Sequence, residues 1–418
     1  MTSADGVAAK LEEALRPFLH GDLPVRLKAW DDSVAGPVDA PLVVLNSVDA
    51  VRRLLWHPGE LGAAQAYVTG EIDVPGDLDH ALTHAFAVAK ERGLGSRPKT
   101  AAVVRAIRTA AGIGALGRPP AAPVSQARLR GRLHSQLRDR SAISFHYDLS
   151  NEFYELILEP QMAYSCGYHS TPDVSVEQAQ RAKLDLVCRK LGLEPGMTLL
   201  DVGCGWGSMS LHAAEHFGAR VTGITIAAEQ KRFIDERIRE RGLEDRVTIL
   251  LRDYRDSVGR YDAVCSIEMG EHVGEDNYPA YASVLHRSVE PGGRVLVQQM
   301  SRTGKWPGGG PFIESFIAPD MYMRPVGETV ALLERSGLEV RDVHGLREHY
   351  VLTVAGWLEN FHRNRDRLVE MMGEEVVRVW ELYLVGGSMA FRDGRMGVDQ
   401  ILMVRPDGEH TLPLVRDW

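Results

Sequence analysis

The sequence has no run of about 18 apolar residues, and this absence argues against a helix that crosses a membrane. It also has no excess of positive charge. The net charge is −9, so any attraction to nucleic acid or anionic lipid has to be local. The first segment, MTSADGVAAKLEEALRPFLH, carries acids inside its apolar pattern, which is not typical of a signal peptide. We therefore expect a cytoplasmic protein that can lie on the inner face of a membrane without spanning it.

Cysteine is scarce as well. The chain has four cysteines in 418 residues, with neither a CxxC pair nor the spacing of a disulfide framework. We expect reduced thiols of a cytosolic protein and no metal site. The four are Cys166, Cys188, Cys204 and Cys265.

Three regions differ in pattern, and the length favours two domains. Residues 1–85 mix a short amphipathic helix with short alternating segments such as PLVVLNS, which is typical of a small α+β module. Residues 86–140 are a basic linker, in which GRPPAAP breaks any helix. Residues 141–418 alternate strand-like with helix-like runs. This alternation predicts an α/β domain with a mostly parallel sheet and helices on both faces.

The linker region is rich in arginine, with eight between positions 101 and 140 against one acid, Asp139. In TAAVVRAIRTAAGIGAL, Arg105 and Arg108 are offset from the apolar positions, as in a helix at a membrane surface. Arg128, Arg130 and Arg132 follow and would add to the attraction for anionic lipid. A solvated linker is the alternative interpretation. Nucleic acid is not an expected partner, because the segment has no aromatic residue.

A glycine-rich loop follows the first strand of the alternating region. In LLDVGCGWGSMSLHAAEHFGARVTGITI (199–226) the strand ends at Asp201 and turns into a helix through Gly203, Gly205 and Gly207. Glycine allows positive φ and close approach of the backbone to a ligand, and open α/β sheets bind ligands at the carboxyl ends of their strands. The spacing is GxGxG, not the GxGxxG of dinucleotide sites, and no P-loop lysine is present.

Polar residues end the next two strands. TIAAEQ (225–230) closes the second strand, where a polar side chain could reach a ribose, and RDY (252–254) closes the third, where Asp253 could face an adenine amine. The pattern resembles that of class I S-adenosylmethionine-dependent methyltransferases. A tight turn in an unrelated α/β protein is the alternative.

A more specific resemblance comes from FHYDLSNEFYELILEPQMAYSCGYH (145–169) together with DVGCGWG and EHVG. With these motifs the chain resembles the cyclopropane-fatty-acid synthase family, which includes the mycolic acid methyltransferases. The resemblance covers about 141–400. The segment LGAAQAYVTGEIDVPGDL (61–78) is similar to the N-terminal, lipid-binding-type domain of the larger bacterial members.

The resemblance implies methyl transfer from S-adenosylmethionine onto a carbon–carbon double bond of a phospholipid acyl chain. In the family a bound bicarbonate removes a proton from the resulting carbocation. Its ligands correspond here to Cys166, Glu271, Gln298, Met300 (through its backbone) and Tyr350. The cofactor contacts correspond to Tyr147, Tyr164, Ser165, Gly203, Gly205, Thr225, Gln230, Asp253 and Tyr254, joined by Asp201 and Gly207 of the glycine loop. The resemblance also implies a homodimer.

Two departures from the family pattern involve SIEMGEHVG (266–274) and VLVQQM. Gln298 replaces the usual histidine, and Glu268 replaces a glycine, as in the branch that makes hydroxylated or methyl-branched products. Gly270 replaces an aromatic residue, which predicts additional space. We hypothesise that Glu268 takes the place of bicarbonate as the base, giving a methylene or methyl-branched (tuberculostearate-type) chain. A separate reductase would complete the product by saturating the remaining double bond.

Each candidate also has a purely structural interpretation. Glu268 could be a solvated or ion-paired carboxylate, and Glu271 and His272 could cap the helix that follows. Cys166 could be a small buried residue, and Tyr350 could belong to the core. The rival functions are a cyclopropane synthase that uses bicarbonate and a lipid-binding protein that has lost catalysis. A small-molecule methyltransferase would need neither the basic segment nor the N-terminal module.

Overall fold

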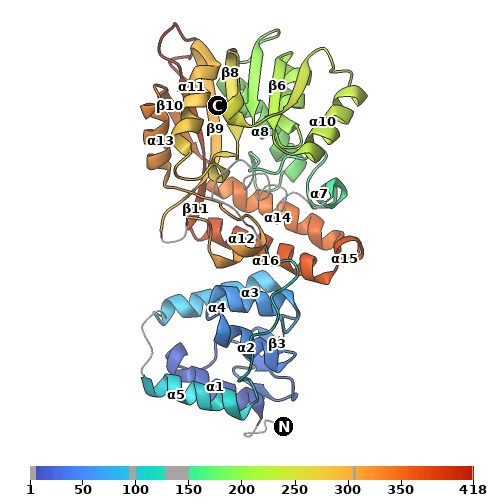
Figure 1. Ribbon diagram of the computed structural model, residues 1–418, viewed down its shortest axis with the longest axis vertical. Helices are drawn as coiled ribbons and strands as arrows, with labels where there is room; N and C mark the ends of the chain where they lie inside the picture. Colours follow the sequence, from blue (N-terminus) through green and yellow to red (C-terminus); the bar gives the residue numbers. More distant parts are fainter. Residues whose placement is uncertain (1–5, 94–99, 128–149, 305–306, 417) are drawn as a thin grey trace. The chain divides into compact units, whose positions relative to one another are not determined.

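The computed structural model describes residues 6–93, 100–127, 150–304, 307–416 and 418 (Figure 1). The chain divides into two compact units. The first contains Met1–Gln126 and Met372–Met389, and the second contains Ala127–Met371 and Ala390–Trp418. Among the described residues, no helix combines the length and the apolar character needed to cross a membrane.

The first unit is a small α+β fold, as the sequence predicts. Its four-stranded sheet has the order β2-β1-β3-β4, in which only β1 and β3 pair in parallel. Leu11, Leu27 and Leu45 belong to the core between this sheet and the helices. The elements are α1 (Val7–Leu19), β1 (Arg26–Lys28), β2 (Val34–Ala35), β3 (Leu42–Leu45), α2 (Val48–Trp56), α3 (Glu60–Val68), β4 (Ile72–Asp73), α4 (Leu78–Glu91) and α5 (Thr100–Gly112).

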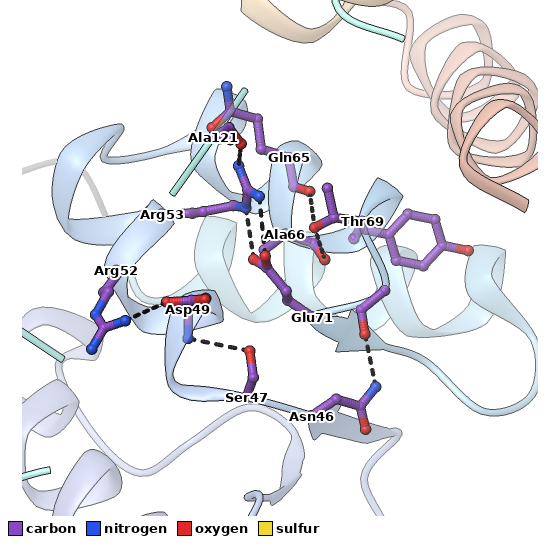
Figure 2. Close-up of polar contacts among 12 residues, drawn as sticks. Asn46, Ser47, Asp49, Arg52, Arg53, Gln65, Ala66, Thr69, Glu71 and Ala121 are labelled. Atoms are coloured by element: carbon purple, nitrogen blue, oxygen red, sulfur yellow. Dashed lines mark hydrogen bonds and ion pairs between the residues drawn. The ribbon is translucent and has the colours of Figure 1, made fainter. Parts of the chain in front are cut away.

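A buried arginine attaches part of the predicted linker to this unit. Arg53 on α2 donates from Nε and Nη2 to both carboxylate oxygens of Glu71, at 2.6 and 3.0 Å, and from Nη1 to the carbonyl of Ala121 at 2.9 Å (Figure 2). A bidentate pair of this kind compensates the burial of both charges. Helix α5 ends at Gly112, the segment GRPPAAP (117–123) that follows is not helical, and its Ala121 packs on the first unit.

The division into units differs from the predicted boundaries in a second way. Residues 372–389, which include most of α16 (Glu374–Arg392), belong to the first unit. There Arg378 donates to the carbonyls of Tyr67 and Ile72, at 2.6 and 2.8 Å. A contact between segments about 300 residues apart leaves no local pattern in the sequence.

The second unit contains a seven-stranded sheet with the order β10-β11-β9-β8-β5-β6-β7. Strands β9, β8, β5, β6 and β7 run in parallel, and β11 is antiparallel to both β9 and β10. The elements are α7 (Asn151–Ile157), α8 (Val176–Leu191), β5 (Thr198–Val202), α9 (Ser208–Phe217), β6 (Arg220–Thr225), α10 (Ala228–Glu240), β7 (Val247–Leu251), η1 (Tyr254–Asp256), β8 (Tyr261–Ile267), η2 (Gly270–His272), α11 (Tyr278–Ser288), β9 (Val289–Arg302), α12 (Pro311–Phe316), α13 (Val326–Arg335), β10 (Glu339–Gly345), α14 (Arg347–Arg363), α15 (Arg365–Met372) and β11 (Met396–Val404).

Helices cover both faces of this sheet, which confirms the predicted fold class (Figure 1). Leu199 of β5 joins the core formed with α8, α9 and α10, and its neighbour Leu200 joins the core formed with α11 and α13. The alternation follows from the period of two in a strand. Strands and helices alternate between 198 and 302, as the sequence predicts.

Candidate active site

A pocket lies at the carboxyl ends of the parallel strands β5, β6 and β8. Gly203 and Gly205 form part of its wall with φ of 80° and 55°, a conformation in which a side chain is strained. A Cβ added to Gly203 would also approach Cγ of Met269 to 2.8 Å. The glycines let the loop between β5 and α9 turn at this edge of the sheet.

The pocket contains most of the predicted cofactor contacts. The predicted residues in its lining are Gly203, Gly205, Thr225, Gln230, Asp253, Tyr254 and Glu268. The remaining lining residues are Ile224, Ile226, Arg252, Arg255, Met269, His272 and Val273. Of these only His272 was singled out in the sequence, as a residue of EHVG. Arg252 and Arg255 flank Asp253 and Tyr254, and this adjacency is the one signal that could have identified them.

The polar groups of the pocket are held in place. Thr225 donates from Oγ1 to Oε1 of Gln230 at 3.0 Å. Arg255 donates from Nε and Nη2 to the two carboxylate oxygens of Asp253, at 2.8 and 2.7 Å. Apolar walls from Ile224, Met269 and Val273 with a few fixed polar groups suit a nucleoside. The residues present therefore fit S-adenosylmethionine, as the glycine loop predicts.

Asp201 and Gly207 are not among the described residues that line the pocket. Asp201 is buried and accepts hydrogen bonds from Ser210 Oγ at 2.7 Å and from the Cys265 thiol at 3.6 Å. Burial raises its pKa to about 6, against the effect of these hydrogen bonds. Gly207 precedes α9 with φ of 83°, and a Cβ there would collide with Ile234. Both residues support the loop from inside the fold.

Tyr164 and Ser165 lie in a segment between α7 and α8, and they too are absent from that lining. The Tyr164 ring packs beside Trp357, with centroids 5.3 Å apart. Ser165 is buried, and its Oγ accepts a hydrogen bond from Lys183 Nζ at 2.8 Å. Tyr147 lies outside the described residues, as do Arg128, Arg130 and Arg132.

Glu268, at the end of β8, is the centre of a converging set of donors. Its backbone has φ of 50°, a left-handed conformation that is uncommon for a residue other than glycine. Its amide donates to the Gln298 carbonyl at 2.6 Å. The Glu268 carboxylate accepts from the Cys166 backbone N–H at 2.8 Å and from Gln298 Nε2 at 2.8 Å, both at Oε1, and from Tyr350 Oη at 2.6 Å at Oε2.

The predicted catalytic residues Cys166, Gln298 and Tyr350 are thus brought together around Glu268. Cys166 takes part through its backbone: its N–H bonds Glu268, and its carbonyl accepts from Gln298 Nε2 at 3.3 Å. Its thiol is buried, and burial followed by the Glu268 charge raises the thiol pKa well above the ordinary value. Gln400 on β11, which the sequence did not indicate, donates to Oε1 of Gln298 at 2.9 Å and orients its amide.

Glu271 has a different environment from Glu268. It is fully buried, and no donor among the described residues meets the geometry of a full hydrogen bond to either carboxyl oxygen. Burial, with the nearby Glu268 charge as the second cause, raises the Glu271 pKa to about 8, although the amides of Glu271 and Met300 oppose the rise. Burial also raises the Glu268 pKa, but the bonds from Tyr350, Cys166 and Gln298 work against that effect.

The expectation of free space at Gly270 is wrong. Gly270 is buried, and a Cβ added to it would collide with Oε1 of Gln299. The ring of Tyr278 would be its next nearest neighbour, at 3.4 Å. Gln299 is fixed there because it accepts from Tyr278 Oη at 2.6 Å and donates to Thr329 Oγ1 at 3.3 Å. The side chain of Gln299, on the neighbouring strand β9, fills the space that the absence of an aromatic side chain at position 270 would otherwise leave.

The glycine loop after β5, the strand order of the seven-stranded sheet and the pocket at the strand ends together define a class I S-adenosylmethionine-dependent methyltransferase. Residues 134–401 match the family model described as mycolic acid cyclopropane synthetase, so the chain belongs to that family.

Relatives extend the likeness over nearly the whole chain. A probable fatty acid methyltransferase of Pseudomonas putida is 35% identical over 420 residues, covering 98% of each chain. Tuberculostearic acid methyltransferase UfaA1 of Mycobacterium tuberculosis is 31% identical and covers 92% of this chain and 88% of its own. The crystal structure of mycolic acid cyclopropane synthase CmaA1 with S-adenosylhomocysteine and CTAB has 30% identity and a TM-score of 0.60, covering 63% of this chain and 98% of its own. The protein is an S-adenosylmethionine-dependent enzyme that modifies fatty acyl chains.

Proposed function

We propose that the enzyme methylates the double bond of an oleoyl-type phospholipid acyl chain and that Glu268 then removes a proton, giving a methylene or methyl-branched chain. The convergence of three donors on the Glu268 carboxylate carries this proposal. The same carboxylate belongs to a residue that lines the predicted cofactor pocket. The names of the Pseudomonas and Mycobacterium relatives, a fatty acid and a tuberculostearic acid methyltransferase, fit this product class.

The chemistry needs a base close to the new cation. When bound, S-adenosylmethionine supplies the methyl group, and the alkene forms the new carbon–carbon bond as the carbon–sulfur bond breaks. The cation on the acyl chain then shifts a hydride and loses a proton to a Glu268 oxygen, which leaves a carbon–carbon double bond in the product. Saturation of that bond to a methyl branch requires a separate reductase. The Glu268 carboxylate also stabilises the cation before the proton leaves.

Of the two carboxyls, Glu268 is the one suited to accept the proton. Three hydrogen-bond donors stabilise its ionised form. Burial raises the Glu271 pKa and so favours its protonated form, which makes Glu271 the poorer base. Since Glu268 occupies the donors offered by Cys166, Gln298 and Tyr350, we propose that the enzyme works without bicarbonate.

The test is lipid analysis of a host that expresses the wild type or Glu268→Gly. Glycine accepts a φ of 50°, so this variant should keep the local backbone. We expect a methylene or methyl-branched chain from the wild type by gas chromatography–mass spectrometry, without dependence on bicarbonate. Glu268→Gly should lose that product, and bicarbonate should restore turnover and favour a ring. A cyclopropane as the sole wild-type product would overturn the proposal in favour of a cyclopropane synthase.

A turnover assay distinguishes an active enzyme from a lipid-binding protein that has lost catalysis. Vesicles that contain oleoyl phospholipid should stimulate release of S-adenosylhomocysteine from the purified wild type. Vesicles of fully saturated phospholipid are the control, because they offer the same head group and no double bond. Equal release with both would contradict methylation of the alkene.

We also propose that α5 binds the surface of an anionic membrane, so that the enzyme is peripheral. Val103, Val104 and Ile107 are 37%, 42% and 48% exposed, and Arg105 and Arg108 are exposed on the same helix. Exposed apolar side chains beside arginines suit insertion at the level of lipid head groups.

A further inference from the structure

Two fully buried lysines lie on the same face of α8, seven residues apart. Lys183 and Lys190 each have an exposed fraction of 0%. Burying an ammonium group costs several kcal/mol unless nearby charges and hydrogen bonds compensate. Lys190 has such partners at β10, namely Asp342 at 3.3 Å and Nδ1 of His344 at 3.1 Å. Lys183 points to a different place, the segment that holds Glu268.

Lys183 reaches Glu268 through Ser165. Its Nζ donates to Ser165 Oγ at 2.8 Å, and the next residue, Cys166, donates its backbone N–H to Glu268 Oε1 at 2.8 Å. One turn earlier on α8, Gln180 donates from Nε2 to the carbonyls of Ala163 and Ser165, at 3.1 and 2.5 Å. Helix α8 therefore fixes the position of the amide that bonds the carboxylate.

Lys183 is also a charge close to Glu268. Burial lowers the Lys183 pKa, and among the charges that oppose this effect Glu268 has the largest influence. The titratable groups that face Lys183 or Glu268 come from several elements: Glu159, Cys166, Asp201, His212, Glu271 and Tyr350. Several are acidic, so a positive charge among them favours their ionised forms.

We infer that Lys183 is a positioning residue whose buried ammonium holds the Cys166 amide in place and keeps Glu268 ionised as the base. The inference rests on the proposed role of Glu268.

The experiment compares four variants of the full-length enzyme. Lys183→Met removes charge and donor, Lys183→Gln removes the charge but keeps a donor, and Lys183→Arg keeps the charge. Lys190→Met is the matched control, because it removes an equally buried lysine from the same helix. Release of S-adenosylhomocysteine with oleoyl phospholipid vesicles is measured from pH 5 to 9.

Loss of the charge should raise the pH at which the base becomes ionised. We expect the acid limb of the rate profile to move to higher pH in Lys183→Met and Lys183→Gln, since the loss of a nearby positive charge raises a carboxyl pKa. Lys183→Arg and Lys190→Met should keep the wild-type midpoint. A midpoint in Lys183→Gln equal to that of the wild type would overturn the inference, whatever the stability of Lys183→Met.

A second readout does not depend on turnover. The infrared carboxyl band of Glu268, identified by its loss in Glu268→Gln, should titrate at higher pH in Lys183→Gln than in the wild type. An unchanged titration would contradict the role of Lys183. If the wild type releases no S-adenosylhomocysteine, the proposed function fails. The infrared titration still decides whether Lys183 keeps the Glu268 carboxyl ionised.

Discussion

Glu268 and Glu271 lie three residues apart, yet their carboxyls have opposite environments. The Glu268 carboxylate receives three hydrogen bonds, and the Glu271 carboxyl receives none from the described residues. A buried carboxylate with donors is stabilised in its charged form, and one without donors holds its proton. The division of roles that we propose for the two residues therefore follows from where the donors lie.

The thiol of Cys166 should be dispensable. We expect Cys166→Ala to keep its rate of S-adenosylhomocysteine release within about threefold of the wild type, because Cys166 contacts Glu268 and Gln298 through its backbone. Glu268→Gln is the comparison, with an expected loss of roughly 10²–10⁴-fold for removal of a base. A loss in Cys166→Ala as large as that in Glu268→Gln would show that the thiol takes part.

Glu271 should make the fold less stable as the pH rises. Its pKa is raised from 4.5 to about 8, so between these values the folded state binds a proton that the unfolded state has lost. Stability therefore falls with rising pH across this window. Glu271→Gln removes the titrating group. Urea unfolding at pH 5 and pH 8 should show a smaller decline for Glu271→Gln than for the wild type. Equal declines would contradict the raised pKa.

At the scale of elements, the site lies where neighbouring strands end. The end of β5 contributes the glycine loop, β6 contributes Thr225, and β8 contributes Glu268, all on one edge of the sheet. These positions were predictable, because apolar strands with period two and glycine-rich turns are local patterns. Gln400 and Gln299 were not predictable, because they reach the site through the β11–β9 pairing and through packing beside Gly270.

Gly203 should tolerate no side chain. In Gly203→Ala the Cβ would press on Met269 at a φ of 80°, so the loop has to shift. We expect S-adenosylhomocysteine to bind at least about tenfold more weakly by calorimetry. Gly242→Ala is the matched control, because it has a similar φ of 63° with nothing within 4 Å of the added Cβ. Equal affinities in the two variants would argue against a role for the Gly203 turn.

At the scale of the whole molecule, the chain combines a methyltransferase unit with a small α+β unit that carries α5. Exposed apolar residues lie beside arginines on α5, which supports the proposed membrane surface over the alternative of a solvated linker. The net charge of −9 makes general attraction to anionic lipid unfavourable, so the proposed membrane binding would depend on such a local segment.

Neutralising α5 should weaken membrane binding. We expect Arg105→Gln with Arg108→Gln to lower the affinity for anionic liposomes by roughly 30-fold in sedimentation assays, since each arginine near the surface contributes about 1 kcal/mol. Arg189→Gln with Arg260→Gln removes the same charge from exposed sites of the second unit and is the control. Equal losses in both double variants would refute a specific role for α5.

The sequence by itself determined the fold class, the glycine loop, the strand ends with Thr225 and Asp253, and the unusual Glu268. Each depends on residues close together in the chain, where periodicity and turn chemistry operate. The family resemblance placed Cys166 and Tyr350 in the same site as Glu268, but only the tertiary structure showed which of their atoms bond its carboxylate, because Tyr350 is 82 residues away and Cys166 is 102. The same holds for Lys183, for Gln299 beside Gly270 and for the attachment of Ala121 to Arg53. Packing brings such residues together, and no local pattern records which side chains meet.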